Sequence, residues 1–264
     1  MTSTATPAST VLVDVQQNVA VVTLNRPENS NVLNLPMGRA LLEAALTCER
    51  DPRVRAVVLT GAGKHFCFGG DLRGMMSDSG AVEPYLRELT SFLHQAISHF
   101  VRMDAPVIAA VNGTAAGAGV GLVAMADLAL CAESSKFSLA YTGVGLTPDG
   151  STSFFLPQIL GQKRALELIL TNRVLTAAEA LSWGLVNQLV PDADVLGEAL
   201  KLAGRLAAGP KHAFGKPKRL VAGASGALES HMVLESQTIA RQAGTAEGRE
   251  GIQAFLDKRK PQYG

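Results

Sequence analysis

Apolar residues along the first half of the chain follow strand patterns. Val11–Val15 and Val19–Asn25 alternate apolar with polar residues on either side of a short polar turn, which predicts a β-hairpin. Val54–Thr60, Val107–Val111 and Leu128–Cys131 are almost continuous apolar runs, typical of strands buried on both faces of a parallel sheet. We therefore expect an α/β fold in which these runs form one sheet.

Helical periodicity separates these strands. The spacing of apolar residues predicts one helix that opens at Pro36 and another over Tyr85–Met103, and Leu122–Asp127 is typical of a short buried helix. The apolar side of the second helix contains Leu86, Leu89, Leu93, Ala96, Ile97 and Phe100.

The pattern changes in the second half of the chain. From Ser151 onward it predicts mainly helices, with one short strand at Leu185–Val190. Helices over Val195–Ala208, Ala222–Ala243 and Glu247–Lys258 have no further strands to cover. We expect these helices to pack on one another or on a second subunit.

Two of the strands run directly into glycine-rich turns and then into helix starts. Pro106–Gly121 reads PVIAAVNGTAAGAGVG, and residues 56–72 read AVVLTGAGKHFCFGGDL. Such a turn presents unpaired backbone N–H groups, which can bind an anion or an oxygen that becomes negative during a reaction. Close packing of a helix on a sheet would explain one such turn equally well, but two together favour a binding site.

Composition limits the possible partners. The 264 residues carry a net charge of +1, so we expect neither a nucleic acid nor an anionic membrane as partner, and any phosphate site must be local. The chain is 47% hydrophobic but only 5% aromatic, which suits one large domain with a core of small aliphatic side chains. The three cysteines lack CxxC spacing, which is typical of a reducing compartment, and we predict a cytoplasmic protein.

Several segments could be mistaken for other features. Ala105–Ala126 is free of charge over the length of a membrane span, but its Asn-Gly break and small residues favour a buried strand, turn and helix. Residues 1–10 lack the basic and apolar regions of a signal peptide, and we expect a flexible tail there. His65 and Cys67 have no second pair of ligands at a suitable spacing, so no metal site is predicted.

The two glycine turns, together with Gly145-Leu-Thr-Pro-Asp-Gly150, resemble the crotonase superfamily, the enoyl-CoA hydratase/isomerase group. The resemblance extends over nearly the whole chain. It implies a crotonase-like ββα spiral as the acyl-CoA-binding core over residues 11–200 and a C-terminal helical oligomerisation region over residues 201–264. It also implies an acyl-CoA thioester as substrate, coenzyme A as part of that substrate with no separate cofactor, and a homotrimer or a dimer of trimers.

The same resemblance assigns the oxyanion hole. Gly70 and Ala118 match the positions whose backbone N–H groups bind the thioester carbonyl oxygen in this superfamily. The two glutamates of the hydratases are missing, because Gly121 stands at the first position and Tyr141 at the second. Hydration by two carboxylates is therefore not expected.

Asp149 is the remaining candidate acid. A Pro-Asp-Gly turn is commonly a solvated Asx turn or a helix cap. However, the isomerases of aromatic acyl-CoA breakdown and the dienoyl-CoA isomerases place a proton-carrying aspartate at this point. In 4-chlorobenzoyl-CoA dehalogenases the matching aspartate is a nucleophile assisted by a histidine that corresponds to His94, with an aromatic residue where Tyr141 stands.

The resemblance also implies residues that contact coenzyme A. Arg26 and Arg73 stand at loop ends where the superfamily contacts the phosphates, and Lys258 and Lys260 reach them from the C-terminal helix of this or a neighbouring subunit. Phe68 stands where small residues are usual, and it either narrows the acyl pocket or fills the core.

The leading hypothesis is an acyl-CoA enzyme in which Asp149, as a solitary acid, shuttles a proton along a thioester enolate, with isomerisation favoured over hydration. One alternative is hydrolytic dehalogenation of an aryl-CoA with Asp149 as nucleophile. The other is an acyl-CoA-binding protein without catalytic activity.

Overall fold

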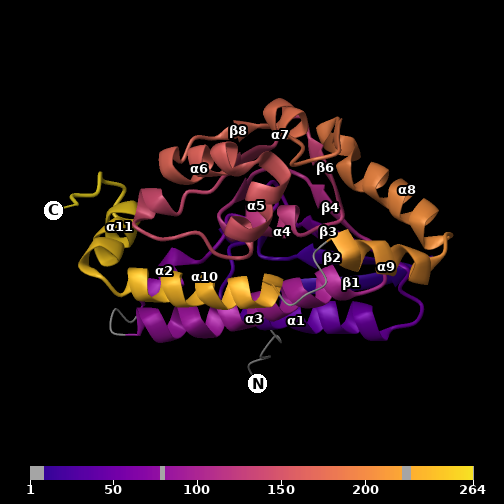
Figure 1. The fold of residues 1–264 in the computed structure, drawn as a ribbon, viewed down its shortest axis with the longest axis horizontal. Helices are drawn as coiled ribbons and strands as arrows, with labels where there is room; N and C mark the ends of the chain where they lie inside the picture. The colour runs from indigo at the N-terminus through magenta and orange to yellow at the C-terminus, as the bar shows by residue number, and fades with distance from the viewer. Residues whose placement is uncertain (1–8, 78–80, 222–226, 264) are drawn as a thin grey trace, which may run out of the picture.

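A computed structural model describes residues 9–77, 81–221 and 227–263, and arranges them around a mixed sheet flanked by helices (Figure 1). The tail expected over residues 1–10 falls mostly on residues 1–8, which lie outside the described residues. The same holds for residues 222–226, the beginning of the helix expected over residues 222–243.

The large sheet has six strands in the order β1-β2-β3-β4-β6-β9. β1 and β2 form the predicted antiparallel hairpin, and every other pair in this sheet is parallel. A second sheet has the order β5-β7-β8. The strands are β1 (Val11–Gln16), β2 (Val19–Leu24), β3 (Ala56–Gly61), β4 (Val107–Val111), β5 (Ala115–Ala116), β6 (Leu128–Ala132), β7 (Lys136–Ser138), β8 (Leu175–Thr176) and β9 (Gln188–Val190).

Several helices begin at the side-chain caps that their sequence provides. Asn34 and Asp71 accept backbone N–H groups at the starts of α1 and α2, and Thr176 and Glu179 form a capping box at α7. The α-helices are α1 (Leu35–Arg50), α2 (Leu72–Met76), α3 (Val82–Arg102), α4 (Ala118–Ala124), α5 (Thr152–Leu160), α6 (Gln162–Thr171), α7 (Ala177–Trp183), α8 (Val195–Ala207), α9 (Lys211–Val221), α10 (Ala227–Ala243) and α11 (Ala246–Leu256).

The main hydrophobic core lies on one side of the large sheet. α1 and α3 pack on each other there, and α10 runs along α3 (Figure 1). The six apolar residues predicted for one side of α3 are all buried. The α/β fold class and the main strands and helices predicted from the sequence are therefore confirmed.

α8 covers the opposite face of the sheet, which corrects the prediction that the helices after residue 195 have no strands to cover. Ala199, Ala203 and Ala207 are buried against side chains of β2, β3 and β4, such as Val58 and Ile108. A stripe of alanines at helical spacing lets the helix backbone approach the sheet closely. The boundary expected between residues 200 and 201 falls inside this helix.

α4 begins earlier than the expected span of Leu122–Asp127. Gly117, with a φ of 52°, turns the chain directly into the helix at Ala118. The helix stops at Ala124, because Asp127 exchanges two hydrogen bonds with Val107 at the start of β4. The charge-free segment over residues 105–126 thus contains a strand, a turn and a short helix, and no helix within the described ranges could cross a lipid bilayer.

The alanine face of α8 gives a test of this packing. Ala203→Leu is expected to destabilise the protein by about 1–3 kcal/mol, because the larger side chain has no space against the sheet. Gly204→Ala is the matched control, since a Cβ at this exposed position meets nothing within 4 Å. It should stabilise by up to about 1 kcal/mol through helix propensity. Urea unfolding measures both, and a neutral Ala203→Leu would contradict the packing.

Candidate active site

The two glycine turns meet at the ends of the adjacent strands β3 and β4. Cys67 forms a parallel bridge with Ala115, and its carbonyl oxygen accepts the N–H of Ala116 at 2.8 Å. A Cβ placed on Gly119 would lie 2.3 Å from the same carbonyl oxygen, so this position requires glycine. The turns therefore pack backbone on backbone.

Gly70 and Ala118 lie on these two turns. A Cβ added to Gly69 would be 3.3 Å from the backbone nitrogen of Ala118, which shows how closely the two segments approach. Within the described ranges, neither the N–H of Gly70 nor that of Ala118 donates a hydrogen bond to the protein. Both residues line one pocket, so two unpaired backbone donors belong to the same cavity.

This pocket has a volume of about 310 Å³ and a mainly apolar wall. Asp149 supplies the one charged side chain among its described lining residues. The apolar side chains come from several elements and include Leu33, Leu72, Met75, Leu86, Leu89 and Leu139. An apolar pocket with one carboxylate and two amides suits a ligand that is largely hydrophobic and carries one carbonyl group.

Asp149 is buried, with 4% of its surface exposed, which excludes the solvated Asx turn. Its backbone carbonyl accepts the hydroxyl groups of Tyr141 and Thr152, each at 2.8 Å. Gly150 and Ser151 both have positive φ values, 64° and 65°. A non-glycine residue in this conformation is held there by its surroundings, so the turn is fixed from several sides.

Tyr141 uses its hydroxyl for this turn. The burial of the phenol and the charges of Asp149 and Glu235 raise its pKa well above the usual value, so the side chain stays neutral. Because its one hydroxyl proton is donated to the Asp149 carbonyl, the structure places Tyr141 as a residue that positions the turn.

His94 projects from α3 and its Nε2 lies 2.9 Å from Oδ1 of Asp149, with both side chains buried. Burial lowers the pKa of His94, but the charge and hydrogen bond of Asp149, together with the charge of Glu235, outweigh this and raise it. The structure thus pairs two residues that are 55 positions apart in the sequence, and their joint action stays a prediction.

Glu235 on α10 is a third buried ionisable group here, and it was missed by sequence reasoning. Its carboxylate accepts the N–H groups of Ser151 at 2.7 Å and Ser153 at 2.9 Å, and the Ser153 hydroxyl. Burial, and then the charge of Asp149, raise the pKa of Glu235 to about 7. The expectation of a solitary acid is therefore wrong.

A signal for Glu235 was present in the sequence. Along α10 the buried residues include Leu228, Met232, Glu235 and Ile239, which follow one helical stripe. A glutamate on the apolar stripe of a helix requires partners when it is buried, because an unpaired buried charge is strongly unfavourable.

His94, Asp149 and Glu235 bring possible metal-ligand atoms within 4.8 Å of one another. However, Asp149 and His94 bind each other, and both oxygens of Glu235 accept hydrogen bonds from the α5 segment. Donor atoms that are already engaged favour a hydrogen-bonded acid cluster over a metal centre.

Of the residues expected to contact coenzyme A, Phe68 alone is among the described lining residues of the pocket. Phe68 lines the pocket, is 40% exposed and packs edge-on against His65, so it stands at the rim. Arg26 is mostly buried: its guanidinium donates to the Val32 carbonyl at 2.7 Å and pairs with Asp71 at 3.4 Å. Its position supports the loop before α2.

The basic residues of α2 and the C-terminus are exposed. Arg73 lies on α2, and Lys258 and Lys260 follow α11. α11 packs against α2 of the same chain (Figure 1). Its Phe255 lines the pocket. The C-terminal helix therefore borders the pocket within one chain.

The position of the first hydratase glutamate is sterically closed. A Cβ on Gly121 would lie 2.0 Å from the carbonyl oxygen of Gly150. No side chain fits here unless the turn that follows Asp149 moves.

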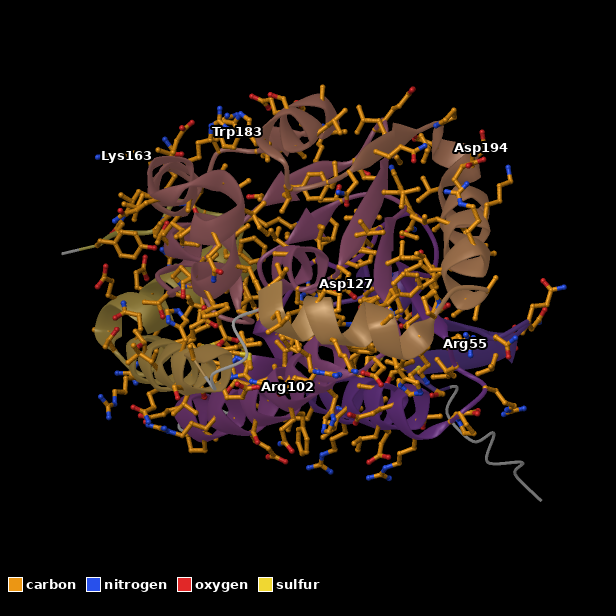
Figure 2. The ribbon with its side chains drawn as sticks, turned by 45° about the vertical axis from the view of Figure 1, so that its right-hand side comes forward. Arg55, Arg102, Asp127, Lys163, Trp183 and Asp194 are labelled. Atoms are coloured by element: carbon orange, nitrogen blue, oxygen red, sulfur yellow. The ribbon has the colours of Figure 1, made fainter. Side chains whose placement is uncertain are left out.

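A larger cavity of about 660 Å³ lies elsewhere, between α9 and the segment that follows α4. The charged groups among its described lining residues are Asp127, labelled in Figure 2, and Lys218, and these two form an ion pair at 2.8 Å. Asp127 also accepts the N–H of Val107. These side chains are engaged in holding α9 to the sheet, so we assign the chemistry to the smaller pocket.

Comparison with known proteins agrees with this architecture. Residues 14–264 match the model of the family described as enoyl-CoA hydratase/isomerase. A solved enoyl-CoA hydratase from Mycobacterium avium subsp. paratuberculosis superposes with a TM-score of 0.87 at 30% identity, and the match covers 98% of this chain and 100% of that one.

Three relatives have different named activities. A probable enoyl-CoA hydratase of Rhodobacter capsulatus is 40% identical, and the 1,2-epoxyphenylacetyl-CoA isomerase of Escherichia coli is 36% identical, each over 96% of this chain and 97% of the relative. The 4-chlorobenzoyl coenzyme A dehalogenase-2 of an Arthrobacter species is 35% identical over 94% of this chain and 91% of its own. The chain is an enzyme of the enoyl-CoA hydratase/isomerase family, within the crotonase superfamily, as the glycine turns predict.

Proposed function

We propose that the enzyme moves a double bond in an enoyl-CoA-type thioester through an enolate, with Asp149 as the proton carrier. The observation that carries the proposal is the pocket itself, in which one buried carboxylate lies among apolar side chains beside two unpaired backbone amides. The isomerase relative of Escherichia coli supports this class of reaction.

In the proposed mechanism the thioester carbonyl oxygen accepts the N–H groups of Gly70 and Ala118. These donors stabilise the negative charge that forms on the oxygen when a proton leaves the neighbouring carbon chain. The carboxylate of Asp149 takes that proton and returns it to a different carbon, so the double bond moves and no other reactant is consumed. His94 orients the carboxylate through its 2.9 Å contact.

Hydration is less well supported than isomerisation. It would need a positioned water and a second acid at the pocket wall. Gly121 leaves no space for that acid, and the hydroxyl of Tyr141 is donated to the Asp149 carbonyl. A pocket with an apolar wall and one carboxylate suits transfer of a proton by that carboxylate and shields the acyl chain from water.

For coenzyme A, we propose that Arg73, Lys258 and Lys260 face the phosphates. Arg73 is an exposed cation of α2, and the two exposed lysines follow α11; both helices contribute a lining residue to the pocket, Leu72 and Phe255. Arg26 would then support this region through its pairing with Asp71. We further propose that the enzyme forms a homotrimer or a dimer of trimers through the C-terminal helices.

Hydrolytic dehalogenation of an aryl-CoA is the second candidate. Here the carboxylate of Asp149 would attack the aromatic carbon and expel halide, and water would then hydrolyse the aspartyl ester. His94 supports this, because it lines a separate groove of about 460 Å³ between α3 and α10, from which water can approach the pair. The dehalogenase relatives also favour it.

Asp149→Asn should lower kcat by about 10²–10⁴-fold, because the amide cannot accept the proton. KM should change little, since the side chain keeps its shape. The measurement is turnover over a panel of enoyl-, dienoyl- and aryl-CoA thioesters by mass and absorbance. Asp14→Asn, on exposed β1, is the control and should leave turnover unchanged. Full activity of Asp149→Asn would end the proposal.

Labelled water separates the two candidate reactions. In single turnovers with excess enzyme, isomerisation should leave the carboxylate of Asp149 unlabelled, whereas dehalogenation should transfer solvent oxygen into it. The peptide that contains Asp149 is analysed by mass spectrometry after each substrate is consumed. Label at Asp149 with a halogenated aryl-CoA would favour the nucleophile.

Ala118→Pro tests the oxyanion hole. Ala118 is the first residue of α4, a position at which proline is tolerated because the helix does not use this N–H. The change replaces the donor by a methylene group, so kcat should fall by at least about 10²–10³-fold. Thermal unfolding should remain close to that of the wild type, and retained activity would show that this amide does not bind the substrate.

A further inference from the structure

Glu235 is a buried carboxylate that the proposed reaction does not use. It is 4% exposed and is not among the described lining residues of the acyl pocket. Its ligand atom and those of His94 and Asp149 all lie within 4.8 Å of one another. A second carboxyl group so close to the proposed proton carrier affects the net charge of the cluster of His94, Asp149 and Glu235.

The first effect of Glu235 is geometric. By accepting the N–H groups of Ser151 and Ser153 and the Ser153 hydroxyl, it joins α10 to the start of α5. Ser151 is held at a φ of 65°, directly after Gly150 at 64°. The Glu235 carboxylate therefore stabilises the strained turn that places Asp149 in the pocket.

The second effect is electrostatic. The ionisable groups that face Glu235 are His94 from α3, Asp149 from the turn, His231 from α10 itself, with Nε2 at 3.7 Å, and Tyr141. Burial lowers the pKa of His231, so its imidazole is mainly neutral at pH 7. One imidazolium at His94 cannot balance two carboxylates, so the cluster favours a second proton.

We propose that Glu235 is a positioning residue that holds this second proton and thereby sets the charge of the His94–Asp149 pair. Its kinetic consequence rests on the proposed role of Asp149 as proton carrier, but its effects on His94 and on stability do not. The effects on the pKa of His94 and on stability depend only on the groups that surround Glu235, so they can be measured without substrate.

The effect on stability has a definite sign. The pKa of Glu235 is raised from 4.5 to about 7 on folding, so between these values the folded state binds the proton more tightly than the unfolded state. The stability contributed by this proton is lost as the pH rises toward and through 7. The wild type should therefore lose stability between pH 5 and pH 8.

Glu235→Gln removes this ionisation while it keeps an acceptor oxygen. In this variant the free energy of unfolding should fall less between pH 5 and pH 8 than in the wild type. The pKa of His94 should also decrease, because the charge of Glu235 helps to raise it. NMR of labelled histidine side chains measures the second effect, with His94→Gln used to assign one resonance among the five histidines.

Glu229→Gln is the matched control on the same helix. Glu229 binds Arg102, which lies at the end of α3 (Figure 2), and Ser98. The hydrogen bonds from Arg102 and then from Ser98 lower the pKa of Glu229 to about 2. It stays ionised from pH 5 to pH 8, so its loss should lower stability by the same amount throughout this range and leave the titration of His94 in place.

Ser153→Ala provides a second test should Glu235→Gln fold poorly. The Ser153 hydroxyl lowers the pKa of Glu235, so its removal should move the loss of stability to higher pH. Unchanged pH dependence in both variants, with His94 titrating as in the wild type, would overturn the proposal.

Kinetics completes the test. The pH profile of kcat should lose its inflection near pH 7 in Glu235→Gln, and Glu235→Asp should restore an ionisation. If His94 and the stability respond as expected but no thioester is turned over, the assigned reaction is wrong and the role of Glu235 stands. A residue that only holds the turn would lower kcat equally at every pH.

Discussion

The parallel pairing of β3 with β4 is the constraint on which the site depends. Adjacent parallel strands end at the same edge of a sheet, so the turns that follow them must meet. The small residues of both turns allow direct backbone contact at Cys67 and Ala115, and this contact brings Gly70 and Ala118 to one pocket. Packing of a different kind, with side chains between the turns, would have separated the two amides.

The acid beside these amides depends on elements far apart in the chain. Three contacts hold the Asp149 turn: the Tyr141 hydroxyl donates to the Asp149 carbonyl, the Glu235 carboxylate accepts the N–H of Ser151, and His94 contacts the Asp149 carboxylate. These partners come from the loop after β7, from α10 and from α3. The C-terminal helices α10 and α11 thus contribute residues to the site of their own chain.

Local patterns in the sequence were sufficient for the strands of the large sheet, for α3 and for the family, because apolar periodicity and the glycine turns are local signals. They did not indicate the short strands of the second sheet. The family motif also pointed to His94 and Asp149, which the structure brings into contact. The local patterns predicted the helix α8 but not its position on the sheet, because its alanine stripe is too weakly hydrophobic to indicate a sheet partner. Glu235 was missed because its partners lie more than 80 positions away. Its place on the apolar stripe of α10 was a local signal, but the contacts that satisfy a buried carboxylate there are tertiary.

The contact between Gly121 and the Gly150 carbonyl bears on how activities diverge within the family. A glutamate at position 121 and the present backbone at position 150 exclude each other, since the first carbon of the side chain would already overlap the carbonyl oxygen. One substitution therefore cannot add a hydratase acid while the Asp149 carboxylate stays in place. A carboxylate at position 121 would therefore require the loop at Gly150 to move, which makes the backbone of this loop a second determinant of which acid the pocket can carry.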